Sequence, residues 1–323
     1  MQRRAAWDHS LACARAPPRG GGQRLIRSPV GVAVGIVAGE PHGAGVRADR
    51  PPHLLGDPQH HRAVGDDAIH ENPELSWEEH EAAARITALL EDAGFEVTRG
   101  AYGVPTGFEA VYGTGTLTVA LCAEYDALPG VGHARGHNVI AAAGVGAALG
   151  LLPVADAAGL RVKLLGTPAE EHGGGKVSML LEGAWEDVDF SMMVHGMTGG
   201  DTSASAFRST AVDLARLWDR NLEARGRTIL EAPLGGGSTD MGNVSQVVPS
   251  IHPSIAFLGE TAVPHNPDFA AAATPAADDA VIDGAVLLAW TALDTACDEN
   301  LRSELHRRTA ARSAGATRIT LEA

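Results

Sequence analysis

Hydrophobic and polar residues repeat with a helical period just after residue 70 and then in shorter, strand-like runs. Residues 78–93 begin with acidic side chains and place Ala82, Ile86, Leu89 and Leu90 on one face, which predicts an amphipathic helix that Gly94 ends. Bounded apolar runs predict strands at 95–98, 108–112, 117–123, 161–166 and 190–195, and the helical period predicts further helices near 138–152, 175–181 and 281–309.

The alternation of strands with helices predicts an α/β fold. We expect three α/β/α layers around a mostly parallel sheet, with the last helix covering one face. Ligands of such sheets bind at the carboxyl ends of the strands. The chemistry should therefore lie in the loops that follow Ala123, Gly166 and Val194.

The composition of the first 66 residues differs from that of the rest. Residues 1–50 hold eight arginines against three acidic residues, whereas the whole chain of 323 residues carries a formal charge of −15. Prolines and glycines interrupt residues 17–22, and no helix or strand pattern fits well up to residue 66. We predict a poorly structured basic segment over 1–66 and a folded domain over 67–323.

Charge and cysteine usage exclude several function classes. An acidic domain repels phosphate backbones and anionic membrane surfaces, so we expect binding to neither nucleic acid nor a membrane. The three cysteines form no CxxC pair, and the apolar runs at 30–38 and 139–152 are shorter than the about 18 residues that span a bilayer. We expect a cytoplasmic protein.

Metal-ligand residue types gather in the predicted strand-end loops. Glu124 and Asp126 with His137 follow the first of these strands, Glu170 and Glu171 the second, and His195 the third. Adjacent glutamates at the end of an apolar strand are costly unless they face water or a cation neutralises them. For the glutamate pair alone, a solvated loop and a metal site are equally good interpretations; the two histidines favour the metal.

Six short motifs follow one another along the chain: Ile69–Leu75, Glu124–Gly130, Gly136–Asn138, Gly166–Glu171, Val194–Gly196 and Gly237–Asn243. In this order they resemble the motifs of the M20 metallopeptidases. They resemble most the amidohydrolase branch, with its aminobenzoyl-glutamate hydrolases, aminoacylase-1-like dipeptidases and plant auxin-conjugate hydrolases. The resemblance implies a zinc-exopeptidase-like catalytic domain that hydrolyses an N-acyl amino acid, aminobenzoyl-glutamate or a dipeptide.

The resemblance also implies a role for each matching residue. Glu170 would be the general base. The metal ligands, for zinc or manganese, would be His137, Glu171, His195 and His265, with Asp126 and Asp240 beside them. His265 could instead be a plain loop residue. His172 and His133 are expected to lie outside the site, although His133 could replace His137 as a ligand if that segment is helical. His252, which precedes Pro253, is expected to be structural.

Arg135 stands where the family has a cysteine that binds the metals as a thiolate. A guanidinium has no lone pair to donate, so this ligand position is lost and one ion is favoured over two. A single ion could be held by Glu171, His195 and His265, or by His137 and Glu171. Alternatively Arg135 pairs with Glu170 or Glu171 and the site is empty.

The family's lid and dimerisation domain is the second departure. Only residues 213–234 separate the segments that flank this insertion, whereas an independent domain needs about 50 residues or more. We predict that the lid is deleted near 213–234, which argues against the family's homodimer. The lid supplies an oxyanion-stabilising histidine in the family, and loss of such a donor costs about 100- to 1,000-fold in rate.

These observations leave two functions open. The first is a metal-dependent amidohydrolase with reduced activity on a small amide or dipeptide substrate. The alternative is a catalytically inactive M20 remnant that binds a small molecule or a protein through the old cleft. A serine esterase is disfavoured, because Ser238 lacks the glycine two positions later that a nucleophile elbow requires.

Overall fold

The computed structural model describes residues 66–198, 202–204, 211–230, 238–258, 265–270 and 274–314. The predicted basic segment 1–66 therefore lies outside the described residues except for its last one. The helices are α3 (Asp66–Glu71), α4 (His80–Asp92), α5 (His137–Leu151), α6 (Ala155–Ala158), α7 (Gly175–Leu181), α8 (Val212–Ala224), α9 (Met241–Val247), α10 (Pro275–Cys297) and α11 (Glu299–Ala314), with 3-10 turns η1 (Ala101–Gly103) and η2 (Pro267–Ala270). The strands are β1 (Glu96–Arg99), β2 (Phe108–Tyr112), β3 (Leu117–Ala123), β4 (Leu160–Gly166), β5 (Phe190–Met192), β6 (His195–Thr198), β7 (Thr202–Ala204), β8 (Thr228–Leu230), β9 (Ser250–Ile251) and β10 (Ser254–Leu258).

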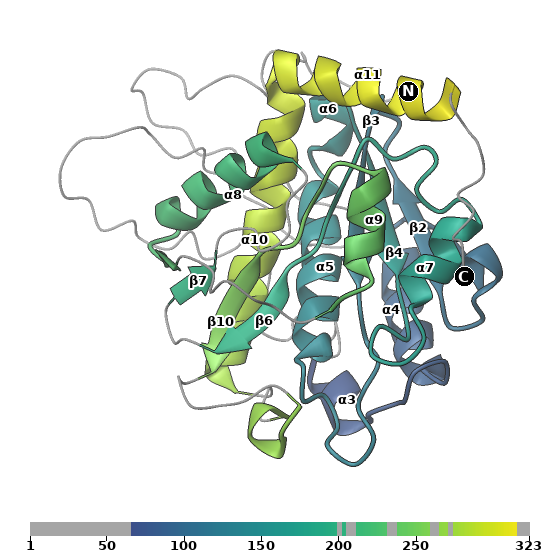
Figure 1. The fold of residues 1–323 in the computed structure, drawn as a ribbon, viewed down its shortest axis with the longest axis vertical. Coiled ribbons are helices and arrows are strands. Elements are labelled where there is room, and N and C mark those ends of the chain that lie inside the picture. Colours follow the sequence, from purple (N-terminus) through teal and green to yellow (C-terminus); the bar gives the residue numbers. More distant parts are fainter. Residues whose placement is uncertain are drawn as a thin grey trace, which may run out of the picture.

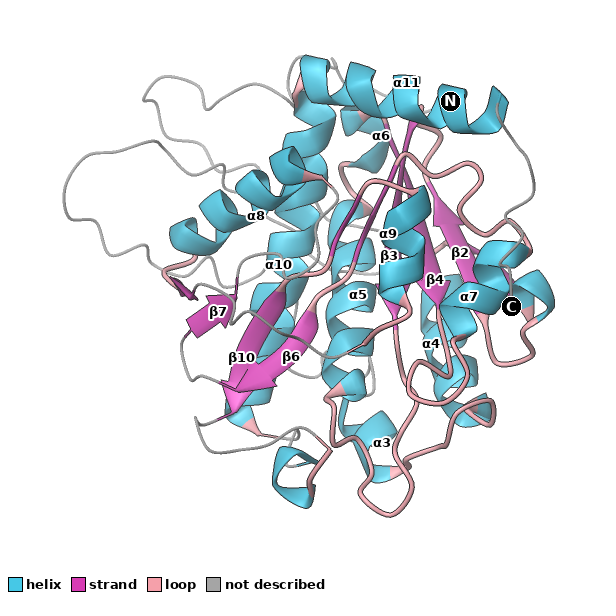
Figure 2. Ribbon diagram, in the orientation of Figure 1, coloured by secondary structure: helices cyan, strands magenta, loops and turns pink. Residues whose placement is uncertain are grey.

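The main sheet has six strands in the order β1-β2-β4-β3-β5-β9. Figure 2 labels β2, β4 and β3, which lie next to one another in this sheet. Strands β4, β3, β5 and β9 are parallel, and β2 and β1 extend the sheet with antiparallel pairing. The register of β3 and β4 runs from Leu117 opposite Leu160 to Ala123 opposite Gly166, so both strands end at the same edge. The predicted mostly parallel sheet is confirmed.

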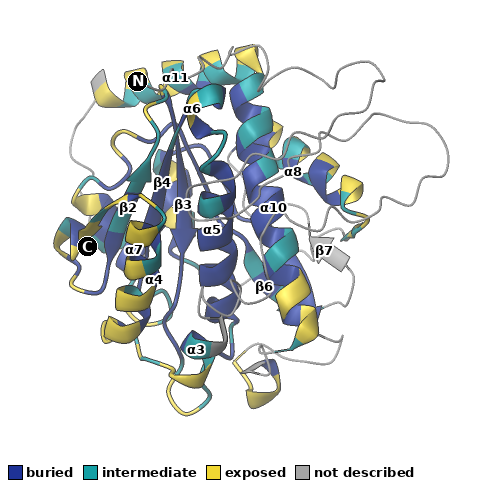
Figure 3. Cartoon of the chain, turned by 180° about the vertical axis from the view of Figure 1, so that it is seen from behind, coloured by how far each residue is buried: buried dark blue, intermediate teal, exposed yellow. Residues whose placement is uncertain are grey.

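Helices cover both faces of this sheet, as the three-layer prediction requires (Figures 1 and 3). Leu117, Val119 and Leu121 of β3 point into a core shared with α4, α5 and α10. Ala120 and Cys122 point the opposite way, into a second core shared with α7 and α9. A strand buried on both faces reads as a continuous apolar run, which is why β3 was evident in the sequence.

The last predicted helix, 281–309, is in fact two helices. Asp298 has an extended conformation between α10 and α11, and its carboxylate accepts hydrogen bonds from the backbone N–H groups of Asn300 and Leu301. This aspartate caps the start of α11 and so breaks the helical run.

Among the described helices, α10 alone is long and apolar enough to cross a membrane, and the apolar runs considered in the sequence did not include it. In its most apolar window, 61% of the residues are buried within the protein. It packs along α5 and against α8 (Figure 1). Burial in the core accounts for the composition of α10.

The predicted strand 190–195 is also divided. Its first half is β5 of the main sheet, whereas β6 joins a second sheet of four strands in the order β6-β10-β7-β8. The stretch expected to mark the lost lid contains α8, which buries Leu214, Trp218 and Leu222, and β8, which pairs with β7. The sequence pattern predicted neither of these two elements. That a lid is deleted near 213–234 stays a prediction.

Candidate metal centre

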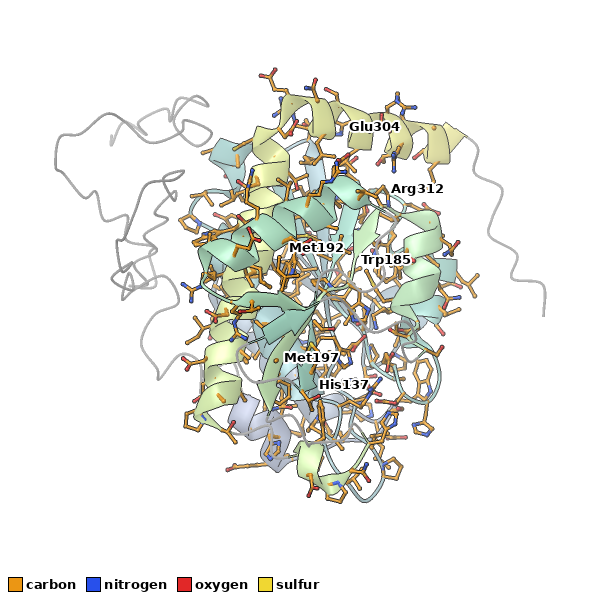
Figure 4. The ribbon with its side chains drawn as sticks, turned by 60° about the vertical axis from the view of Figure 1, so that its left-hand side comes forward. His137, Trp185, Met192, Met197, Glu304 and Arg312 are labelled. Atoms are coloured by element: carbon orange, nitrogen blue, oxygen red, sulfur yellow. The ribbon has the colours of Figure 1, made fainter. Side chains whose placement is uncertain are left out.

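The predicted site residues come together at one edge of the main sheet. Glu124 directly follows β3, Glu170 lies four residues after β4, and His195 begins β6. His137 is the first residue of α5, and Figure 4 shows it at the end of the molecule opposite Glu304 and Arg312 of α11. The carboxyl ends of the parallel strands therefore carry the charged groups, as expected for this fold.

His137 lies at the centre of the cluster and is fully buried. Its Nδ1 lies 2.8 Å from the backbone oxygen of Asp126 and 3.0 Å from Oδ1 of the same residue. Its Nε2 lies 3.5 Å from Oε2 of Glu124, and 3.9 Å from both Oε2 of Glu170 and Oε1 of Glu171. An Nδ1–H donated to Asp126 leaves the Nε2 lone pair facing three carboxylates.

Two buried polar atoms of this arrangement lack a hydrogen-bond partner among the described residues. They are Nε2 of His137 and Oε2 of Glu124. Burial alone would lower the pKa of His137, but Asp126, followed by Glu124 and Glu170, outweighs it and raises this pKa to about 10. Without a metal, His137 thus keeps a proton among the carboxylates. A divalent ion would take the place of that proton.

Lys176 neutralises a different part of the cluster. Its ammonium is fully buried and contacts the carboxylate of Glu124 and, at 2.8 Å, Oδ1 of Asp240. The backbone N–H of Lys176 donates to Oδ2 of Asp240 at 2.9 Å. Glu124, Glu170 and Asp240 are close enough together to bind an ion, but the ammonium already supplies positive charge there.

Lys176 had no role in the sequence-based site. A signal was present, since it is one of only two lysines in the chain and follows the glycine run behind Glu171. A buried lysine needs anionic partners, and the nearby acidic motifs could have supplied the hypothesis.

Glu171 is held by an arginine, a histidine and a backbone contact. Nε of Arg135 donates to its Oε1 at 3.2 Å, and Nε2 of His265 lies 3.4 Å from its Oε2. The backbone N–H of Glu171 donates to Oδ2 of Asp126 at 3.0 Å. Of the alternatives that the sequence left open for Arg135, the structure has the pair with Glu171.

His195 and His265 lie beside this cluster, whereas the ring of His133 contacts the backbone of Ile69 instead. His195 lies beside His137, with ring centres 6.2 Å apart, and could hold an ion together with His137 and Glu124. His265 is more than half exposed, and its Nε2 lies 3.4 Å from Oε2 of Glu171. His133 is buried with Nε2 3.0 Å from the backbone oxygen of Ile69. It belongs to none of the candidate ligand groups among the described residues.

Two triads that share His137 offer one ligand atom from each residue within 4.8 Å of one another. They are His137 with Glu170 and Glu171, and His137 with Glu124 and His195. Imidazole nitrogens and carboxylate oxygens are the donors that zinc accepts, and manganese also accepts carboxylates. The orphaned Nε2 of His137 and this donor set fit a divalent cation.

No protein-family model matches the chain, but sequence comparison finds relatives that are named as dipeptidases and hydrolases. The Xaa-Arg dipeptidase of Mus musculus is 42% identical over 142 residues, which are 40% of this chain and 33% of the relative. A p-aminobenzoyl-glutamate hydrolase polypeptide of Escherichia coli is 35% identical over 148 residues, 40% of this chain and 31% of the relative. The chain thus spans about a third of the length of these curated relatives.

Solved structures match the fold more extensively. The YXEP protein of Bacillus subtilis, described as a dinuclear metal-binding peptidase from the M20 family, matches with a TM-score of 0.64 at 16% identity, covering 74% of this chain and 99% of that chain. The LapA aminopeptidase of Legionella pneumophila matches with a TM-score of 0.57 at 14% identity, covering 74% of this chain and 72% of that chain. At such identities the likeness concerns the fold alone.

Proposed function

We propose that this chain, a relative of the M20 metallopeptidases in sequence and fold, is a metal-dependent hydrolase of amide bonds. The substrates we propose are N-acyl amino acids, aminobenzoyl-glutamate or dipeptides. The names of two sequence relatives support the last two, and the motif resemblance supports the first. The observation that carries the proposal is the buried Nε2 of His137, which lacks a hydrogen-bond partner in the described structure and faces the carboxylates of Glu170 and Glu171.

By the resemblance of the motifs, His137, Glu171 and His195 would hold the ion; His137 lies in one candidate ligand group with Glu171 and in another with His195. Nε2 of His265 lies 3.4 Å from Oε2 of Glu171, beside the same site. A bound zinc or manganese ion would acidify an attacking water and polarise the amide carbonyl. Asp126 fixes the ring of His137 through Nδ1 and the backbone of Glu171 through Oδ2. Its role is to orient both ligands.

Glu170 is our candidate for the general base. Burial would raise its pKa, but His137, Lys176 and His195 outweigh burial and lower it. The carboxylate is therefore ionised near neutral pH and can accept a proton from water at Oε2. It can then pass that proton to the departing amine nitrogen.

Arg135 favours one ion over two. Its guanidinium lies 3.2 Å from Glu171, where a second dication would otherwise find a carboxylate oxygen. Two unit charges about 4 Å apart repel by about 4 kcal/mol at an effective dielectric of about 20, and a dication doubles this. The same ion pair supports the second candidate function, a catalytically inactive protein that binds a small molecule or protein in the cleft.

Metal content and turnover distinguish the two candidates. The purified protein is dialysed against trace zinc or manganese and its metal is measured by plasma mass spectrometry, for which we expect about one equivalent. Less than a tenth of an equivalent would overturn the enzyme proposal. Hydrolysis of N-acetyl amino acids, aminobenzoyl-glutamate and dipeptides is then measured with Glu170→Gln as the control, which should keep its metal and lose turnover. A cytoplasmic location and the absence of the family's homodimer stay predictions.

A further inference from the structure

The turn that carries Glu170 and Glu171 contains a strained residue. Ala169 has a φ of 56°, in the left-handed region that side chains other than glycine rarely adopt. Strain of this kind persists only where the surrounding structure imposes it, and it occurs most often next to functional groups. The groups that impose it should therefore act on the two glutamates.

Three side chains of one short segment contact this turn or its neighbour. Oε1 of Glu79 accepts a hydrogen bond from the backbone N–H of Ala169 at 2.8 Å. Nε1 of Trp77 donates to the backbone oxygen of His172 at 3.1 Å. The hydroxyl of Ser76 donates to Oδ2 of Asp126 at 3.1 Å, the same oxygen that receives the N–H of Glu171.

The environment of Glu79 indicates that its carboxylate serves to position the backbone of the 169–173 turn. The side chain is fully buried, and its second oxygen accepts from the hydroxyl of Thr106 at 2.8 Å. Burial raises its pKa, against the opposing effect of its hydrogen bonds. No basic side chain of the described residues pairs with it. A buried acid without a cation is costly to the fold, so a purely stabilising role is a poor explanation.

Trp77 is itself held in a strained conformation, with a φ of 73°. Its indole lies directly against Gly173, because a Cβ at that glycine would be 2.3 Å from Nε1 of Trp77. The ring therefore covers the end of the turn that Glu79 does not reach. Both ends of the 169–173 turn are fixed from the same segment of chain.

We propose that Ser76, Trp77 and Glu79 form an anchor that holds the 169–173 turn so that Glu170 and Glu171 face His137, with Glu79 as the main positioning residue. The expected effect of the anchor on metal binding rests on the proposed function. The effect on the turn itself does not depend on whether the protein turns over a substrate.

The test compares two glutamates of the same segment. Glu79→Ala removes the anchor, whereas Glu74→Ala removes a carboxylate that accepts from the N–H groups of Glu81 and Ala82, at the start of α4. Binding of Zn²⁺ is measured by calorimetry, and amide exchange of the 169–173 peptide by mass spectrometry. We expect Glu79→Ala to weaken Zn²⁺ binding by about 10- to 100-fold and to speed exchange at least tenfold. Glu74→Ala should change neither by more than threefold.

Two further variants separate positioning from general damage. Glu79→Gln keeps an oxygen acceptor for Ala169 and should restore both readouts to within about threefold of the wild type. Trp77→Phe keeps the ring but loses the indole N–H, and should speed exchange of the turn. Wild-type exchange in a folded Glu79→Ala protein would overturn the anchor. If the wild type binds no Zn²⁺ but the exchange pattern holds, the proposed function fails and the anchor stands.

Discussion

Arg135 and Glu171 form an ion pair inside the candidate metal centre, with Nε of the guanidinium 3.2 Å from Oε1 of the carboxylate. Their side chains are only 18% and 10% exposed, so water screens the pair weakly. The carboxylate that the site motifs assign to the metal is thus shared with a fixed positive charge. Metal binding must compete with that charge.

Replacing Arg135 should therefore strengthen metal binding. Arg135→Met removes the charge and frees Oε1 of Glu171, and we expect Zn²⁺ affinity to rise at least tenfold in calorimetric titration. Arg135→Cys adds a thiolate donor as well, so it should bind more metal than Arg135→Met in dialysed samples. Equal, wild-type affinities in both variants would show that the ligands do not converge on one ion.

Lys176 is predicted to be essential for stability. Removal of one partner from a buried ion pair costs about 3–5 kcal/mol, because the other charge is left uncompensated. Lys176→Met would leave Glu124 and Asp240 in this state. The control is Lys163→Met. Lys163 is also buried, but its partners Asp187 and Glu109 are 47% and 20% exposed, so water can solvate the carboxylates that are left, and we expect a smaller loss of about 1–2 kcal/mol.

Urea unfolding of both lysine variants, carried out with a chelator present, measures the difference directly. Similar free energies of unfolding for the two would argue that Glu124 and Asp240 become protonated and that the ammonium contributes little. The mass and charge changes are identical, so the comparison isolates the environment of each lysine.

The sequence predicted most of the sheet because its strands are local patterns. β3 is apolar on both faces and β4 is mostly apolar, so both strands were recognisable as apolar runs. A charged motif follows each strand, so the same stretch of sequence also predicted the position of the site. The break at Asp298 was not visible, because α10 and α11 continue one helical pattern and only the capping geometry separates them. The partner of Arg135 could not be chosen either, since Glu170 and Glu171 are adjacent and only the path of the folded chain brings Glu171 within reach of the guanidinium.

His133 should make the protein less stable in mild acid. Burial, with a smaller contribution from the charge of His137, lowers its pKa from the usual value of about 6.5 to about 4. Between these two values the unfolded chain binds a proton that the folded chain does not, so stability falls as the pH decreases from 6.5 to 4. Over this whole range of pH, the free energy of unfolding should fall by about 3 kcal/mol.

His133→Gln removes this titration and can keep the hydrogen bond to the backbone oxygen of Ile69. Other groups titrate over the same range, so the informative quantity is the difference between wild type and variant. In urea unfolding of chelator-treated protein, the wild type should lose about 2 kcal/mol more than the variant between pH 7 and pH 4.5. Parallel stability curves would contradict the prediction.

Gly136 places His137 at the start of α5, and a larger residue should disturb both. Gly136 and Gly130 have nearly the same left-handed φ, 74° and 75°. Alanine at either position should lower the free energy of unfolding by about 1–2 kcal/mol, because of backbone strain. Only at position 136 would the added Cβ clash, lying 2.9 Å from Cζ of Phe257, whereas at 130 nothing lies within 4 Å.

We expect Gly136→Ala to lower the free energy of unfolding by about a further 1–3 kcal/mol and to weaken Zn²⁺ binding, because relief of the clash must shift the residue next to His137. Urea unfolding of both variants measures the stability loss, and calorimetric titration measures their Zn²⁺ affinities. Equal Zn²⁺ affinities in two folded proteins would mean that His137 is not held by the start of α5.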